Sequence, residues 1–146
     1  MQAWLFLGVA ALAGVFMAVQ GAMNGALGKI IGVLEGNFLL HVVGLTVAAL
    51  LLFVFGLGNG SFARMPEAPW YLYLGGLLNV AIIYGVMFSI AKSGAGNATA
   101  AIIAGQLAMA LLIDSLGLFG LQKTPLSWGR GLGLALMAAA AKLLLK

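Results

Sequence analysis

Long apolar stretches alternate with short polar or glycine-rich segments along the whole chain, and this pattern predicts membrane-spanning helices. About 20 helical residues, each rising 1.5 Å, cover the roughly 30 Å hydrocarbon core of a bilayer. Five such stretches leave no room for a soluble domain, so we expect an all-α membrane protein with a single transmembrane domain. The predicted spans are residues 3–27, 37–57, 70–91, 97–117 and 125–145.

Composition agrees with this fold class and excludes several functions. Hydrophobic residues make up 64% of the 146 residues and charged residues only 7%, whereas a soluble domain carries about 25% charged residues. The absence of cysteine excludes disulfides and thiolate-bound metals. One histidine and three acids provide neither a metal cluster nor a catalytic triad, so we expect no cofactor and no enzyme. The seven Lys and Arg residues are scattered, which does not indicate nucleic acid binding.

Polar residues recur at depth in the predicted helices, although lipid offers them no hydrogen-bond partner. Gln106, for example, lies near the middle of the fourth span. Hydrogen bonds between helices would explain any one of these residues without a ligand. One polar group per helix at a common depth, however, is what a midplane binding site needs. The candidate substrate-binding residues are Gln20, Asn24, Thr46, Asn79, Tyr84, Gln106 and Met109, with Met17 and Met87 as further parts of an adaptable apolar wall.

Two ionisable residues are candidates for ion coupling or for ion pairs. His41 lies about one turn inside the second span, and Asp114 lies two turns beyond Gln106. Lys123 or Arg130 could pair with Asp114, so a structural ion pair and a coupling role both stay open. No carboxylate lies at the predicted midplane, so proton exchange at one buried acid has no obvious acid to use.

Small residues predict close helix packing at two places. The first span carries a row of glycines that forms a groove along one side, at Gly14, Gly21, Gly25 and Gly28. The fifth span has Gly129 and Gly133 four residues apart and is apolar all round. Small residues let membrane helices approach closely, and the fifth helix is expected at the periphery or in a dimer contact.

Positive charges give the chain little preference for one direction of insertion. With five spans, one side of the membrane would carry Arg64, Lys123 and Arg130, and the other Lys29, Lys92, Lys142 and Lys146. Cytoplasmic loops are normally enriched in Lys and Arg, and three against four is no enrichment. Either a cofactor or the first helix alone sets the direction, or copies insert both ways and pair antiparallel.

Two motifs resemble those of one family. The first is Gln20-Gly-Ala-Met-Asn24-Gly-Ala-Leu-Gly, and the second runs from Ala104-Gly-Gln106 through Leu112-Ile-Asp114 and Gly117-Leu-Phe-Gly120 to Pro125-Leu-Ser-Trp128. In this order they resemble the small bacterial YdcZ-type inner-membrane exporters of the drug/metabolite transporter superfamily. The resemblance implies a multi-pass protein of the bacterial inner membrane, with five helices per chain and paired inverted copies. Small multidrug transporters of that superfamily carry a glutamate in the first helix, where this chain has only Gln20 and Asn24.

We therefore expect a small-solute transporter that works by alternating access. Its expected partners are membrane lipid, a small neutral or amphipathic organic substrate, and a second copy of the chain. The resulting antiparallel, dual-topology homodimer would resemble a ten-helix drug/metabolite transporter. Two alternatives stay open: a dual-topology small-ion channel lined by amides and hydroxyls such as Thr99, and a membrane accessory protein that transports nothing.

Overall fold

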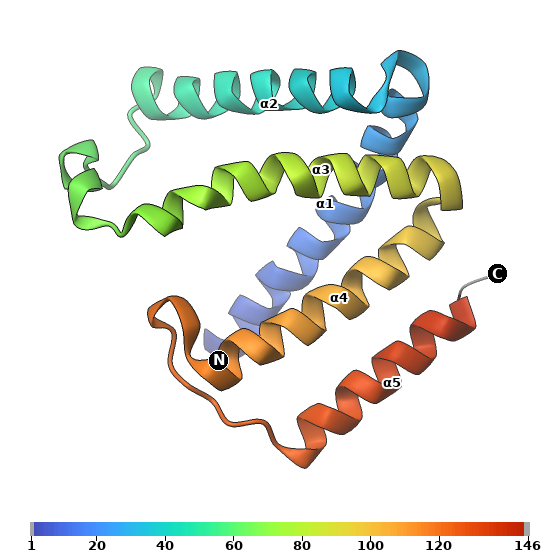
Figure 1. Ribbon diagram of the computed structural model, residues 1–146. Helices are drawn as coiled ribbons and strands as arrows, with labels where there is room; N and C mark the ends of the chain where they lie inside the picture. Colours follow the sequence, from blue (N-terminus) through green and yellow to red (C-terminus); the bar gives the residue numbers. More distant parts are fainter. Residues whose placement is uncertain (1, 145–146) are drawn as a thin grey trace. The chain divides into compact units, whose positions relative to one another are not determined.

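The computed structural model describes residues 2–144, and all regular structure in this part of the chain is helical (Figure 1). The α-helices are α1 (Gln2–Ile31), α2 (Val33–Ala49), α3 (Leu74–Ser93), α4 (Ala95–Leu116) and α5 (Trp128–Leu144). A π-helical segment, Leu50–Val54, continues α2, and short 3-10 segments lie at Phe62–Glu67, Trp70–Tyr73 and Leu118–Gly120. Lys146 and the predicted end of the fifth span at residue 145 lie outside the described residues.

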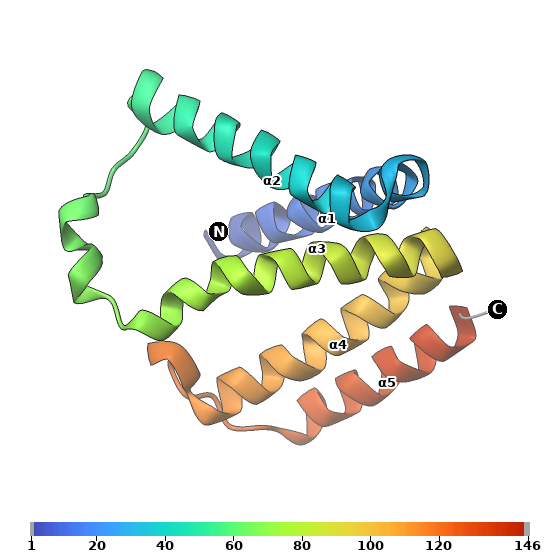
Figure 2. The same cartoon turned by 45° about the horizontal axis from the view of Figure 1, so that its top comes forward.

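The chain forms two compact units, residues 1–92 and residues 93–146. In the first unit α1 packs against α2, and in the second α4 packs against α5. Figure 1 and Figure 2 show α4 and α5 side by side in both views. The prediction of a single transmembrane domain stays a prediction.

Within residues 2–144, four helical segments are long and apolar enough to cross a membrane: Trp4–Ile31, Val33–Val54, Trp70–Ser93 and Ala95–Leu116. These four correspond in order to the first four predicted spans. The fifth helix, α5, has 17 described residues and is shorter than all of them. The described chain is thus an all-helical protein with four candidate spans.

Several predicted helix boundaries were wrong. The segment between the first two spans was expected to be about nine residues long, but α1 continues to Ile31 and only Gly32 separates it from α2. Gly32 has a φ of 101°, which glycine adopts without the steric cost that other residues meet. The predicted start at residue 125 is three residues early, because the Ser127 hydroxyl accepts a hydrogen bond from Arg130 N at 3.3 Å and caps a helix that begins at Trp128.

Glycines on one face of α1 let this helix approach α3 closely. A Cβ added at Gly21 or Gly25 would lie 2.9 or 2.5 Å from Ile90 of α3, so these glycines let the two helices touch. Gly28 contacts the Met87 side chain in the same way. Gly14 has no atom within 4 Å of such a Cβ. The predicted groove is therefore a packing surface at its C-terminal part and open at Gly14.

We expect Gly25→Ala to destabilise the protein, because its methyl group would overlap Ile90, whose β-branched side chain has little freedom to move away. Overpacking of this kind costs about 1–3 kcal/mol. Gly14→Ala is the matched control in the same helix, and it should leave the free energy of unfolding unchanged or slightly higher because alanine favours helix. Unfolding in mixed detergent micelles measures both. Equal stability of the two variants would show that α1 does not pack on Ile90.

Candidate functional site

Two hydrogen-bonded contacts join α2 to α3 inside the first unit. The Asn37 side-chain amide, Nδ2, donates to the Val80 carbonyl at 2.9 Å. One turn further along α2, His41 Nε2 lies 3.2 Å from Asn79 Nδ2. We call this pair of contacts the α2–α3 polar bridge, and it consists of Asn37, His41, Asn79 and the backbone of Val80.

The bridge fixes the position of the proton on His41. Its Nδ1 lies 2.9 Å from the Asn37 carbonyl oxygen, which can only accept a hydrogen bond. Nδ1 must therefore carry the proton and donate it. Nε2 is then free to accept from Asn79, so both ring nitrogens have partners when the ring is neutral. In the bridge His41 thus donates through Nδ1 and accepts through Nε2.

The bridge lies deep in the apolar part of both helices. His41 is eight residues from the start of the Val33–Val54 span, and Asn79 is nine residues from the start of the Trp70–Ser93 span. At a rise of 1.5 Å per residue these positions are about 12 and 14 Å from those ends, near the middle of a roughly 30 Å hydrocarbon core. Asn79, a candidate substrate-binding residue, thus meets His41, a candidate for ion coupling or an ion pair, near the middle of the two helices.

Asn37 is the most enclosed polar residue of the bridge. Its exposed fraction is 1%, and its side-chain oxygen Oδ1 has no hydrogen-bond donor among the described residues. Leaving a buried acceptor unpaired costs about 1–3 kcal/mol. Such atoms are rare in folded proteins and need an explanation where they occur.

Close packing joins the three helices at Gly36, the residue before Asn37. The Met87 side chain is fully buried, and its terminal methyl group lies between Gly28 of α1 and Gly36 of α2. Asn24 of α1, one helical turn from Gly28, is also buried, with 5% exposed. The prediction that Met87 forms an adaptable wall was wrong, because its whole surface is used in packing the three helices.

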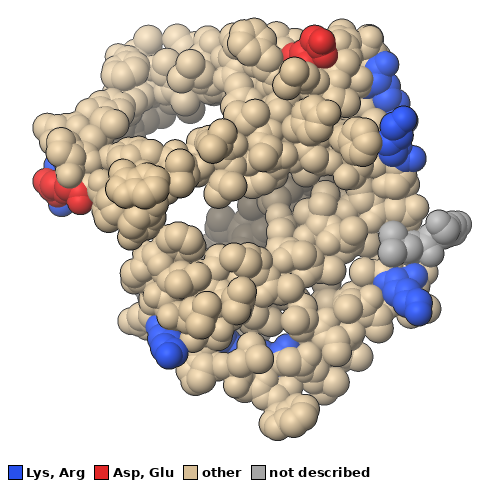
Figure 3. All heavy atoms as spheres, viewed as in Figure 1, with Lys and Arg blue, Asp and Glu red and all other residues tan. Residues whose placement is uncertain are grey.

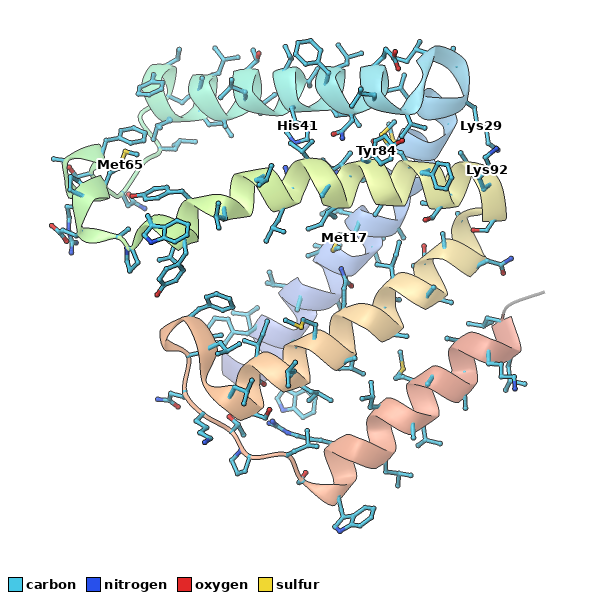
Figure 4. The ribbon with its side chains drawn as sticks, viewed as in Figure 1. Met17, Lys29, His41, Met65, Tyr84 and Lys92 are labelled. Atoms are coloured by element: carbon cyan, nitrogen blue, oxygen red, sulfur yellow. The ribbon has the colours of Figure 1, made fainter. Side chains whose placement is uncertain are left out.

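Tyr84 borders the bridge on α3. Val80, Tyr84 and Met87 are spaced by four and three residues and so share one stripe of the helix. Figure 4 shows His41 and Tyr84 between α2 and α3. The Tyr84 side chain is 44% exposed and makes no side-chain hydrogen bond to another described residue. Its ring and hydroxyl are therefore accessible next to the bridge.

An opening leads to the bridge from one side. The space-filling view in Figure 3 shows a gap between α2 and the first half of α3. In the same view, Figure 4 places His41 at the edge of this gap. The hydrogen bond between Asn79 and His41 thus stands between the opening and the enclosed Asn37.

The remaining predicted site residues do not join the bridge. The Thr46 hydroxyl donates to Val42 O of its own helix at 2.8 Å and needs no other partner. Gln20 of α1 is exposed, as are Gln106 and Met109 of α4. Within the described residues neither glutamine has a side-chain hydrogen bond. Met17 is 52% exposed on α1.

Asp114 takes part in a contact within the second unit. Its Oδ2 lies 3.9 Å from Arg130 Nη1 of α5, which is an ion pair but too long for a hydrogen bond. Its backbone oxygen accepts from Thr124 N at 2.8 Å. Both side chains are more than a third exposed, so the pair contributes little to stability. Of the two partners considered for Asp114, Arg130 forms the ion pair. The coupling role of Asp114 stays a prediction.

Asn37 was missed as a site residue because residue 37 was predicted as the first residue of its span. The helix begins four residues earlier, at Val33. One signal in the sequence could have identified it. Asn37 and His41 are four residues apart and therefore lie on the same face of a helix.

Comparison with known proteins identifies the family. A family model described as "Putative inner membrane exporter, YdcZ" matches residues 5–143. The chain belongs to this family. The match confirms the resemblance of the two motifs and covers nearly the whole chain. Comparison with curated proteins gives no match, and neither does comparison with solved structures.

Membership in the YdcZ family is consistent with membrane transport. The description of the family is that of inner membrane exporters, and the described residues include four apolar helices of spanning length. Together they support a multi-pass inner-membrane transporter.

Proposed function

We propose that the protein is a small-solute transporter that works by alternating access as an antiparallel homodimer. The observation that carries this proposal is the α2–α3 polar bridge, which places hydrogen-bonding groups near the middle of apolar helices. Exporter family membership supports transport as the purpose of such a site. The substrate class is a small neutral or amphipathic organic molecule.

A second copy is proposed because a single chain leaves most faces of its membrane helices exposed. Only 6–11% of the residues in the apolar windows of the four spans are buried within the chain. Lipid can cover the exposed apolar residues. It offers no hydrogen-bond partner to the amides of Gln20 and Gln106, which are also exposed. A second copy that covers these faces would enclose both glutamines. An inverted copy also fits the nearly equal numbers of Lys and Arg at the two predicted membrane sides.

In this proposal α5 is the fifth span of each chain. Its 17 residues cover about 26 Å at 1.5 Å per residue, at the lower limit of a spanning helix. It carries a shallow hollow of about 360 Å³, lined by Trp128, Gly129, Gly131, Leu132 and Ala135. Small side chains there suit a close contact with the partner copy.

Swelling of proteoliposomes in an iso-osmotic gradient of erythritol tests the function. We expect saturable entry of this poorly permeant neutral solute, at no more than about 10³ molecules per second per dimer. Unsaturable flux far above that rate would indicate a channel. If the protein moves neither erythritol nor other small neutral solutes, it is an accessory protein and the proposal is wrong.

Gln106→Ala should abolish this flux while the dimer survives, because it removes an amide that the second copy is proposed to enclose. Dimer recovery is measured by chemical cross-linking in the same vesicles. Ser115→Ala on the same helix is the control. The Ser115 hydroxyl donates to Leu112 O of its own helix at 2.9 Å, so its loss should leave transport unchanged. Unchanged transport by Gln106→Ala would remove Gln106 from the site.

A further inference from the structure

The enclosed oxygen of Asn37 has an unmet requirement for a hydrogen-bond donor. The amide nitrogen of the same side chain is held by Val80 O at 2.9 Å, which fixes the orientation of the group. Oδ1 is buried, and no donor among the described residues reaches it. An arrangement that buries an unpaired acceptor is less stable than one that pairs it. A donor from outside these residues would therefore complete the arrangement of α1–α3.

The neighbouring groups restrict the chemistry of that donor. Both ring nitrogens of His41 are engaged, and the Asn79 amide nitrogen donates one of its two N–H groups to His41. The side-chain oxygen of Asn79 is a second acceptor beside Asn37 Oδ1. Neither end of the bridge contains a carboxylate. A cation taken from water into this apolar region would lose its hydration without a compensating charge. The groups that remain thus favour a neutral molecule that donates hydrogen bonds.

We propose that the first unit binds a neutral solute through an N–H or O–H group that donates to Asn37 Oδ1. This inference rests on the proposed transport function and specifies the substrate class of the same site. The apolar part of the solute lies toward Tyr84 and the opening between α2 and α3 (Figure 3, Figure 4). Because Oδ1 is enclosed, the Asn79–His41 hydrogen bond must open for entry and can close again behind the donor.

The proposed hydrogen bond to Asn37 Oδ1 predicts which solutes bind, independently of their size or hydrophobicity. Primary amides, ureas and alcohols carry the required donor. The corresponding N,N-dialkyl amides and ethers keep a similar apolar body but cannot donate. Quaternary ammonium ions have no donor and carry a charge, so both features exclude them.

Binding of a matched pair of probes tests the rule. Benzamide and N,N-dimethylbenzamide are titrated calorimetrically into the purified full-length protein in detergent, with benzyl alcohol and benzyl methyl ether as a second pair. We expect the donor-bearing member of each pair to bind at least about tenfold more tightly, since a missing partner for a buried polar group discriminates strongly. Asn37→Leu should abolish this difference, and Ser115→Ala should keep it.

The wild-type comparison alone can overturn the inference, whether or not Asn37→Leu folds. Equal binding within either pair, no measurable binding of benzamide and benzyl alcohol, or a preference that persists in folded Asn37→Leu protein would each contradict it. Failure of the transport function looks different. If the donor preference is present but vesicles show no flux of any solute, the binding site stands and the transporter proposal falls.

Discussion

Copies of the chain that are forced into one orientation should transport nothing alone and should regain transport when opposite orientations are mixed. Asn59→Lys with Ser61→Lys adds two positive charges to the loop after α2. Glu35→Lys with Ala95→Lys adds positive charge at the opposite predicted membrane side. Because Lys and Arg are retained on the cytoplasmic side, the two double variants should insert in opposite directions. Each alone would lack an inverted partner, and co-expression should restore flux.

Orientation can be measured directly because the chain contains no cysteine. Gly60→Cys provides a single label in the loop after α2, and nothing lies within 4 Å of a Cβ added there. In the unmodified background a membrane-impermeant thiol reagent should label about half of the copies from each face of the membrane, because the charge bias is almost nil. Asn59→Gln with Ser61→Gln is the neutral control and should keep the even distribution. Labelling from one face only would rule out the antiparallel dimer.

The charged ends of the first unit give this experiment its physical basis. Lys29 at the end of α1 and Lys92 near the end of α3 lie at the same end of the unit (Figure 3, Figure 4). At the loop after α2, Arg64 pairs with Glu67 at 2.8 Å and is partly neutralised. The first unit thus carries a modest positive excess at one end, which two added lysines at the other end can outweigh.

The helical pattern and the position of the polar residues could be predicted from the sequence, because both follow from hydrophobicity alone. Apolar length predicts the four candidate spans, and an amide in such a span must find a partner. Asn79 accordingly pairs with His41. The tight Gly32 turn could not be predicted, because a single residue with positive φ interrupts an otherwise continuous apolar pattern. That error moved the start of the second helix and concealed Asn37.

Side-chain roles were harder to predict than helix positions. Thr46 and Met87 both lie at suitable depth, yet Thr46 bonds to its own helix and Met87 fills the space above two glycines. Depth follows from position along a helix, whereas burial depends on which face the neighbouring helix covers. The sequence shows the depth of a residue directly. The burial of Met87 depends on its contacts with Gly28 and Gly36, which are distant from it along the chain.

Breaking the Asn79–His41 hydrogen bond should reduce transport strongly, because this bond joins α2 to α3 at midmembrane depth. Asn79→Leu leaves His41 Nε2 without a donor in an apolar region. An unpaired group of this kind costs about 1–3 kcal/mol, which corresponds to a roughly 5- to 150-fold change. We expect kcat/KM for erythritol in proteoliposomes to fall within that range. Thr46→Val is the control, because its hydroxyl bonds only to Val42 O and its loss should not affect transport.

A double variant separates a role in transport from a role in stability alone. If the bridge only stabilises the fold, Asn79→Leu with His41→Leu removes both polar groups together and should recover stability and flux in parallel, since two matched apolar groups leave nothing unpaired. If the bridge must open and close around the solute, the double variant should recover the free energy of unfolding but not kcat/KM. We expect the second result, because a permanent apolar contact cannot exchange its partner for a substrate donor. Parallel recovery would instead make the bridge a structural contact.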